Sequence, residues 1–274
     1  VQLHPDWAQI DAEGRASPNN VCLLSPYTDE LMLPQLLEVI ADYGIDGMWV
    51  DGENWACQPC YCARCKAEFQ RRTGLEPVPM KRGEPHWDAW LAFQRDLFTE
   101  HVRRFADAVH AKHPNVMICS NWMYTVRQPE PVSAPVDYLS GDYDPVWGSA
   151  RAAIEGRALD SRGLTWDLMA WGFDKGKDLF WALKPAEQIK QEAAVVLMQG
   201  GGFQIYHTPT RSGRVLEDII RQESEAADFC RRRQAASHKS TTVPQVAILN
   251  SAETLFDKCD RVYAGGGYPF EALE

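Results

Sequence analysis

Short apolar runs alternate with helical patterns through most of the 274-residue chain, and this alternation is the feature that most restricts its fold. The helical stretches carry apolar residues three or four positions apart, whereas the runs between them are too short for helices. Strands that alternate with helices predict a parallel sheet covered by helices. Six such runs precede a polar linker near residue 240, and they end near Leu24, Val50, Cys119, Leu139, Trp171 and Tyr206.

Two architectures accommodate a parallel sheet of this kind. An open doubly wound sheet can have six strands, but the dinucleotide-binding type carries a glycine-rich phosphate turn after its first strand, and the sequence has none there. A (β/α)8 barrel needs eight strands. In both architectures the side chains that carry chemistry lie at the carboxyl ends of the strands.

One strand end carries an acidic pair between indoles. The short apolar run Met48–Val50 stops at Asp51, and Glu53 follows two positions later. Trp49 and Trp55 flank the pair and offer surfaces on which a sugar ring can stack. Glycoside hydrolysis usually needs two carboxyl groups, of which one attacks or activates water and the other protonates the leaving oxygen. Asp51 is the predicted attacking group, and its structural alternative is a side chain that caps the loop.

The second carboxyl group has several candidates. If the chain stays extended beyond the strand, Glu53 projects to the same side as Asp51 and can share a proton with it. A surface glutamate, or one that binds a substrate hydroxyl, fits the sequence equally well. Asp142 and Asp144 follow a weaker predicted strand and are the other candidate acids, although Asp-x-Asp-Pro is also an ordinary turn.

Charge and composition restrict the partners. The net charge of −10, with no basic run longer than three arginines, argues against nucleic acid and anionic membranes and admits a neutral carbohydrate. No apolar run approaches the ~20 residues of a membrane span, and no signal-peptide pattern is present. The chain begins without Met and ends within a pattern, so we expect a fragment, with the cytoplasm as its default location. Polar and aromatic residues at predicted strand ends are candidates for substrate binding: Asn121, Trp122, Trp171, Tyr206 and His207.

Four closely spaced cysteines predict a metal-binding loop. Cys57, Cys60, Cys62 and Cys65 have the spacing of a structural zinc site, whose four ligands leave no open position for chemistry. Disulfides are the alternative, but a Cys-x-Cys pair cannot easily bridge to itself. A Cys-rich catalytic centre of a metal-dependent hydrolase is a further alternative.

Three local motifs resemble one group of glycoside hydrolases. Asp46–Gly52 resembles the fourth-strand segment of α-L-fucosidase-like barrels, in which an Asp before a Gly is the nucleophile. Cys60–Cys65 resembles the Cys-Tyr-Cys-x-x-Cys zinc loop of the trimeric bacterial β-galactosidases. Asn19–Tyr27 resembles the third strand of uncharacterised relatives that combine both features. A fourth segment, Val246–Ser251, is similar to the opening of the flavodoxin-like domain that follows such barrels.

The resemblance implies an α/β chain in which residues 1–238 form a (β/α)8 TIM barrel and residues 239–274 form a linker and the start of a second α/β domain. Val21–Leu24 would be the third strand and Phe203–Tyr206 the eighth, which places the first two strands before Val1. The fourth zinc ligand of the resembled β-galactosidases comes from elsewhere in the chain, so Cys57 need not bind the metal. Those enzymes are often trimers, which admits a homo-oligomer here.

The sequence departs from the β-galactosidase pattern at both catalytic positions. In those enzymes the acid is the Glu of an Asn-Glu pair after the fourth strand, whereas the order here is Glu53-Asn54. Their nucleophile is a Glu after the seventh strand, whereas the corresponding stretch here, Thr165–Gly172, contains Asp167 but no Glu. The departure favours a fucosidase-like, retaining glycoside hydrolase with Asp51 as nucleophile and no cofactor for its chemistry. The alternatives are a catalytically inactive carbohydrate-binding barrel, a β-galactosidase-type hydrolase, and a scaffold whose chemistry depends on strands outside this chain.

Overall fold

The computed structural model describes residues 1–51, 57–143, 148–174, 182–259 and 261–263 of a mixed α/β chain. The chain divides into two compact units. The first contains Val1–Ser120, Val132–Val136 and the segment that begins at Asn250, and the second contains Asn121–Pro131 and Asp137–Leu249. None of the described helices has the length and the apolar composition that crossing a membrane requires.

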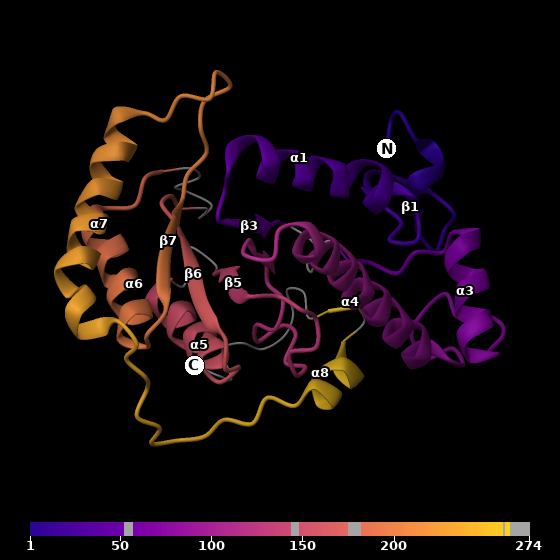
Figure 1. Cartoon of the computed structure of the whole chain (residues 1–274). Coiled ribbons are helices and arrows are strands. Elements are labelled where there is room, and N and C mark those ends of the chain that lie inside the picture. Colours follow the sequence, from indigo (N-terminus) through magenta and orange to yellow (C-terminus); the bar gives the residue numbers. More distant parts are fainter. Residues whose placement is uncertain (52–56, 144–147, 175–181, 260, 264–274) are drawn as a thin grey trace. The chain divides into compact units, whose positions relative to one another are not determined.

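The first unit combines a hairpin, a parallel strand pair and several helices (Figure 1). In chain order they are η1 (Pro5–Trp7), β1 (Ala8–Ile10), β2 (Ala16–Val21), η2 (Thr28–Met32), α1 (Leu33–Tyr43), β3 (Gly47–Val50), α3 (Ala63–Thr73), α4 (Trp87–Lys112), β4 (Met117–Ser120) and α8 (Ala252–Lys258). β1 and β2 pair antiparallel, whereas β3 and β4 pair parallel. α1 ends at Gly44, which has a φ of 59°, a left-handed conformation that glycine adopts without steric cost.

An aromatic core fills the space between α3 and α4. Phe69 of α3 and Trp90 of α4 are fully buried, and their ring centroids lie 5.0 Å apart in an edge-to-face contact. Phe93, one helical turn after Trp90, stacks on it at 5.4 Å. The α4 residues that share this face recur at helical spacing, which is why the sequence predicted a long amphipathic helix here.

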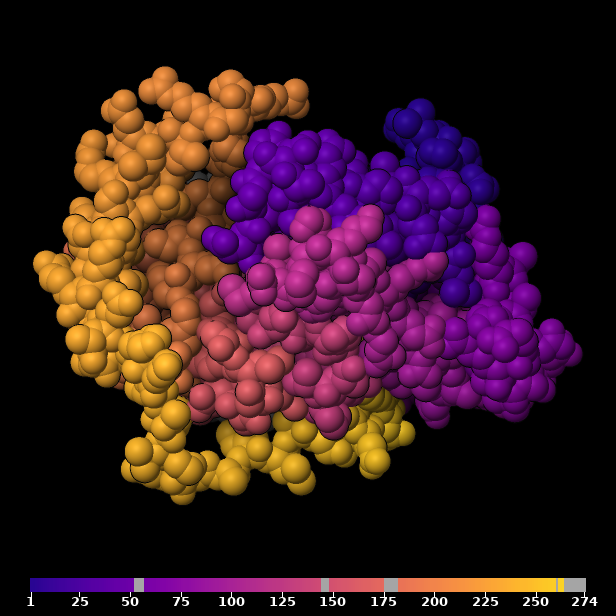
Figure 2. All heavy atoms as spheres, in the orientation of Figure 1, coloured from indigo at the N-terminus to yellow at the C-terminus, as the bar shows by residue number. Residues whose placement is uncertain are grey.

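The second unit is built on a three-stranded parallel sheet in the order β5-β6-β7. Its elements are β5 (Tyr138–Asp142), α5 (Gly148–Asp160), β6 (Thr165–Trp171), α6 (Ala186–Met198), β7 (Gly202–Tyr206) and α7 (Glu217–Ser237). α5 and α6 pack on the sheet, and α7 packs on α6 as an outer layer, drawn in orange in Figure 2.

The two faces of this sheet differ in chemistry. Residues alternate between faces along a strand, and the register pairs Ser140 with Asp167 and Trp171 with Tyr206. One face carries buried apolar side chains, among them Leu139, Trp166, Leu168 and Ala170. The opposite face carries polar and aromatic ones: Ser140, Asp142, Asp167, Trp171, Gln204 and Tyr206. A parallel sheet that keeps polar side chains on one face presents that face to something other than an apolar core.

Five of the six predicted strands are confirmed as β3 to β7. The strand predicted at Val21–Leu24 is wrong, because β2 ends at Val21 and pairs antiparallel with β1, a hairpin that the sequence did not predict. The hairpin reverses at Asp11, whose carboxylate accepts hydrogen bonds from the backbone N–H groups of Glu13 and Arg15. Such local acceptance favours a turn.

Two further expectations at the level of elements need correction. Val246–Leu249 form no strand, and three of these side chains are highly exposed, because no sheet edge pairs with them in the described residues. α5 was not predicted, since its buried face contains only one large apolar residue, Leu159, beside small residues and the charged Arg151 and Glu155. The described strands form two pairs and a triple rather than one closed sheet, so the TIM barrel and the domain boundary near residue 239 stay predictions.

We expect the aromatic core to dominate the stability of the first unit. Phe69→Ala should lower the free energy of unfolding by about 3–5 kcal/mol, because the cavity left by a fully buried ring cannot collapse completely. Tyr43→Ala is the matched control, since Tyr43 is 77% exposed and should change stability by no more than about 0.5 kcal/mol. Chemical denaturation measures both, and equal effects would contradict the assignment of the core.

Candidate active site and metal centre

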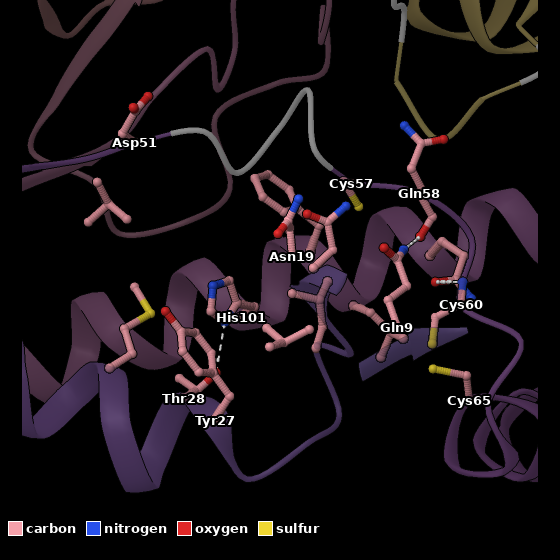
Figure 3. A pocket seen from close by; sticks show the side chains of 18 residues that line it. Gln9, Asn19, Tyr27, Thr28, Asp51, Cys57, Gln58, Cys60, Cys65 and His101 are labelled. Carbon is pink, nitrogen blue, oxygen red and sulfur yellow. Dashed lines mark hydrogen bonds between the residues drawn. The ribbon is translucent and has the colours of Figure 1, made fainter. Parts of the chain in front are cut away.

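Asp51 lies at the carboxyl end of β3 and lines a cavity of about 350 Å³ in the first unit (Figure 3). The volume is in the range of pockets that hold small molecules. Its walls come from the β1–β2 hairpin, η2 and α4. The polar lining includes Gln9, Asn19, Asn20, Tyr27, Thr28, Gln94 and His101. Asp51 is therefore an exposed residue at the edge of a cavity of suitable size.

The remaining residues of the predicted acidic pair are only partly described. Glu53 and Trp55 lie outside the described residues, and so does Asp144. Trp49 belongs to β3 and is half-buried. The pairing of Asp51 with Glu53 therefore stays a prediction.

In the second unit, Asp142 ends β5 and accepts two hydrogen bonds. The Asn121 amide donates to one carboxylate oxygen at 3.3 Å, and the Trp171 indole N–H donates to the other at 2.8 Å. Hydrogen bonds donated to a carboxylate favour its charged form. The structure thus brings together three of the residues predicted for the site, with Asp142 as the acceptor of both hydrogen bonds.

The residue after Asp142 anchors this strand end on the other side. The Tyr143 hydroxyl donates to Glu192 at 2.9 Å, and Glu192 forms an ion pair with Lys184 at 2.8 Å, with both charged side chains 1% exposed. Burial, together with the Glu192 charge, raises the pKa of Tyr143 well above its usual value, so its hydroxyl keeps its proton. The sequence analysis missed this network, because Lys184 and Glu192 are ordinary surface residues by composition.

A second carboxyl group, Asp167, lies deeper on the same sheet face as Asp142. It accepts hydrogen bonds from Ser140 on β5 and from Gln204 on β7, the latter at 2.8 Å, and so connects all three strands. Burial raises the pKa of Asp167, although both hydrogen bonds oppose the shift. Polar residues at alternate positions of apolar strands were the signal that could have revealed this cluster.

Aromatic rings gather at the ends of β6 and β7, as predicted from the sequence. The Trp171 and Tyr206 ring centroids lie 5.6 Å apart, and Phe173 packs against both. Trp122, by contrast, is buried, and the Arg127 guanidinium lies 3.9 Å from its ring centre. One face of Trp122 is therefore covered by Arg127 and cannot stack on a sugar.

His207 is packed rather than open. Its side chain is 4% exposed, and the ring lies so close to Gly172 that a Cβ there would overlap the imidazole. Burial lowers the pKa of His207, and a hydrogen bond with Gln222 offsets part of the shift. Nε2 lies 4.0 Å from a Glu223 carboxylate oxygen. The structure thus supports a neutral imidazole at this strand end.

Four thiols form a buried cluster in the first unit. The Sγ atoms of Cys22, Cys60, Cys62 and Cys65 all lie within 4.8 Å of one another. A tetrahedral zinc site with Zn–S bonds of about 2.3 Å places its sulfurs about 3.8 Å apart, so this donor set fits such an ion. Hydrogen bonds from Cys22, Cys60 and Cys65 lower the pKa of the Cys62 thiol, which favours the thiolate that a metal binds.

Cys57, predicted from the spacing as one of the four thiols, does not belong to this cluster. Cys22, just beyond β2, takes its place, with its sulfur 3.5 Å from those of Cys62 and Cys65. The short spacing within the loop suggested a local set of four, but the hairpin carries Cys22 to the loop from forty positions away. All four cysteines can therefore hold a metal ion without a position left open for substrate.

Among the solved structures, a β-galactosidase shares the fold of this chain. No family model matches the chain, and no curated protein matches its sequence. The β-galactosidase from Bacillus circulans sp. alkalophilus aligns with a TM-score of 0.60 and 18% identity, over 86% of this chain and 44% of that one. α-L-fucosidase isoenzyme 1 from Paenibacillus thiaminolyticus aligns with a TM-score of 0.45 and 16% identity, over 85% of this chain and 45% of that one. Bee venom hyaluronidase aligns with a TM-score of 0.46 and 13% identity, over 84% and 82%.

These structural neighbours are glycoside hydrolases, and the likeness to the β-galactosidase confirms the predicted resemblance at the level of the fold. The chain spans less than half of the length of that β-galactosidase.

We expect the cysteine cluster to bind zinc through Cys22 and not through Cys57. Chains purified with zinc should contain about one ion each, and Cys22→Ser should lose most of it together with thermal stability. Cys57→Ser should keep both, since Cys57 lies outside the cluster. Elemental analysis and melting curves test this, and zinc loss from Cys57→Ser alone would contradict the ligand set.

We expect acid to destabilise the second unit partly through His207. Its pKa in the folded chain is lower than the value of about 6.5 in the unfolded chain, so the unfolded chain binds more protons. The stability that neutral His207 contributes is therefore present above about pH 6.5 and is lost as the pH falls below that value. Melting temperatures at about pH 8 and pH 5 should differ less in His207→Gln than in the parent chain.

The matched control for this measurement is His238→Gln, because His238 is exposed. It should keep the pH dependence of the parent. If His207→Gln has the same pH dependence as the parent chain, the neutral form of His207 does not contribute to the stability of the fold, and the prediction is wrong.

Proposed function

We propose that the chain is the catalytic part of a retaining glycoside hydrolase and that Asp51 is its nucleophile. One observation carries the proposal: Asp51 follows directly on a parallel strand, β3, and borders a cavity of small-molecule size. The fold shared with a β-galactosidase supports the class of reaction. We also propose that the described strands belong to a (β/α)8 barrel and that the substrate of the enzyme is a carbohydrate.

In the proposed reaction, the Asp51 carboxylate attacks the anomeric carbon while a carboxylic acid protonates the leaving glycosidic oxygen. A covalent glycosyl-enzyme forms, and water then hydrolyses it with the same acid acting as base. Glu53 is the first candidate for that acid and Asp144 the second. Asp142 is less suited, because its two hydrogen-bond donors favour the carboxylate over the acid.

The thiol cluster has a structural part in this proposal. A zinc ion held by Cys22, Cys60, Cys62 and Cys65 would fix the segment Cys60–Cys65, which begins nine positions after Asp51. Four thiolates leave no site for a reacting water, so the chemistry stays with the carboxyl groups.

We expect Asp51→Asn to lower kcat on an aryl glycoside by about 10³-fold or more, because an amide cannot form the glycosyl-enzyme. Asp46→Asn is the matched control. Asp46 is exposed and lies before the same strand, so its variant should keep kcat. Melting curves verify that both variants fold.

Normal turnover by folded Asp51→Asn would remove the assignment of the nucleophile. If the parent chain binds aryl glycosides but hydrolyses none of them, the carbohydrate-binding barrel is the better account.

A further inference from the structure

The cavity next to Asp51 contains a buried amide with an unused donor. Gln94 of α4 lines this cavity and is 2% exposed. Its Oε1 accepts a hydrogen bond from the backbone N–H of Cys60 at 3.4 Å, which fixes the orientation of the amide. Its Nε2 is covered from solvent and has no hydrogen-bond partner among the described residues. A buried donor without a partner costs free energy, so a ligand or a water that accepts from it is stabilised.

Two more polar side chains of the cavity are more than nine-tenths buried. Gln9 donates to the backbone carbonyl of Gln58 at 2.6 Å, and His101 is hydrogen-bonded through Nδ1 to the Thr28 hydroxyl at 3.1 Å. These contacts hold both side chains in place before any ligand arrives. In Figure 3, Gln9 and His101 lie along the cavity, whereas Asp51 stands apart at its edge with its carboxylate directed away from both. The polar groups are thus preorganised, which lowers the entropy lost on binding.

The charges around the cavity restrict the ligand. None of its described lining residues is Lys or Arg, and Asp51 is the single carboxylate among them. Apolar side chains, including Met32, Leu97 and Phe98, complete the walls. A neutral sugar presents hydroxyl groups and C–H groups. The amides and the imidazole of the cavity can hydrogen-bond to the hydroxyl groups, and the apolar walls can pack against the C–H groups. An anionic sugar would meet Asp51 without a compensating cation.

We propose that this cavity binds one neutral sugar unit, with the Gln94 Nε2 donating to a sugar hydroxyl and Gln9 and His101 completing its hydrogen bonds. The proposal rests on the proposed function for the kind of ligand, and it adds the residues that hold a sugar in the cavity that Asp51 borders. It also adds a preference for neutral over acidic glycosides.

The test measures binding by ligand-observed NMR, with methyl β-D-galactopyranoside and methyl α-L-fucopyranoside as neutral probes at millimolar concentration. Methyl β-D-glucuronide is the charged comparison. At least one neutral probe should bind, and the glucuronide should not. Gln94→Glu keeps an acceptor for Cys60 and removes the donor, so it should weaken binding about threefold to tenfold, the effect of one lost hydrogen bond.

Gln94→Leu serves as a second variant in case the buried charge of Gln94→Glu disturbs the fold, and melting curves show which variant is intact. Gln70→Leu is the control, because Gln70 is exposed on α3 and lies outside the cavity. It should bind like the parent chain. Equal affinity of the parent and both Gln94 variants, or no binding of either neutral probe, overturns the proposal and leaves water as the occupant of the cavity.

The outcome is separable from that of the proposed function. Sugar binding that depends on Gln94, in a chain that hydrolyses no glycoside, retains this inference and removes the enzymatic one. If hydrolysis depends on Asp51 but KM and affinity are unchanged in the Gln94 variants, the proposed function is retained and the inference about Gln94 is wrong.

Discussion

The contact between Cys22 and the loop Cys60–Cys65 is the constraint that sets where the N-terminal hairpin lies in the first unit. It joins the N-terminal hairpin to a segment some forty positions later, inside a core of aromatic rings. Backbone and amide hydrogen bonds reinforce the junction, from Tyr61 N–H to the Ile10 carbonyl at 2.8 Å and from Gln9 to the loop. Because Cys60 and Cys65 also line the cavity, the shape of the candidate site follows from this junction.

In the second unit, the sheet itself positions the polar side chains. Its sheet buries apolar side chains on one face and keeps carboxyl, amide, hydroxyl and indole groups on the other. Asp142 is held from two neighbouring segments, and the buried pair Lys184–Glu192 fixes the residue that follows it. Loss of one partner of such a buried ion pair leaves an uncompensated charge, so we expect this pair to be needed for the fold around the strand end.

The strands and long helices could be predicted because their apolar periodicity is local. α4 and β3 are read directly from the spacing of their apolar residues, and Asp51 is found by its position after β3. The hairpin and the Cys22 ligand could not be predicted, since both depend on contacts between segments that are distant in sequence. The donors to Asp142 also come from two separate strand ends, so the sequence named Asn121 and Trp171 without showing that they bind this carboxylate.

The account stands on a covalent bond between the Asp51 carboxylate and the anomeric carbon of a sugar. A glycosyl fluoride of the hydrolysed sugar, with a second fluorine on the sugar ring, should trap that bond. The anomeric fluoride leaves without an acid, and the ring fluorine slows hydrolysis of the glycosyl-enzyme. Peptide mass spectrometry should then find one glycosyl group on the peptide that contains Asp51. A label on the peptide of Asp142 or Asp167 instead, or inactivation without a label, would contradict the account.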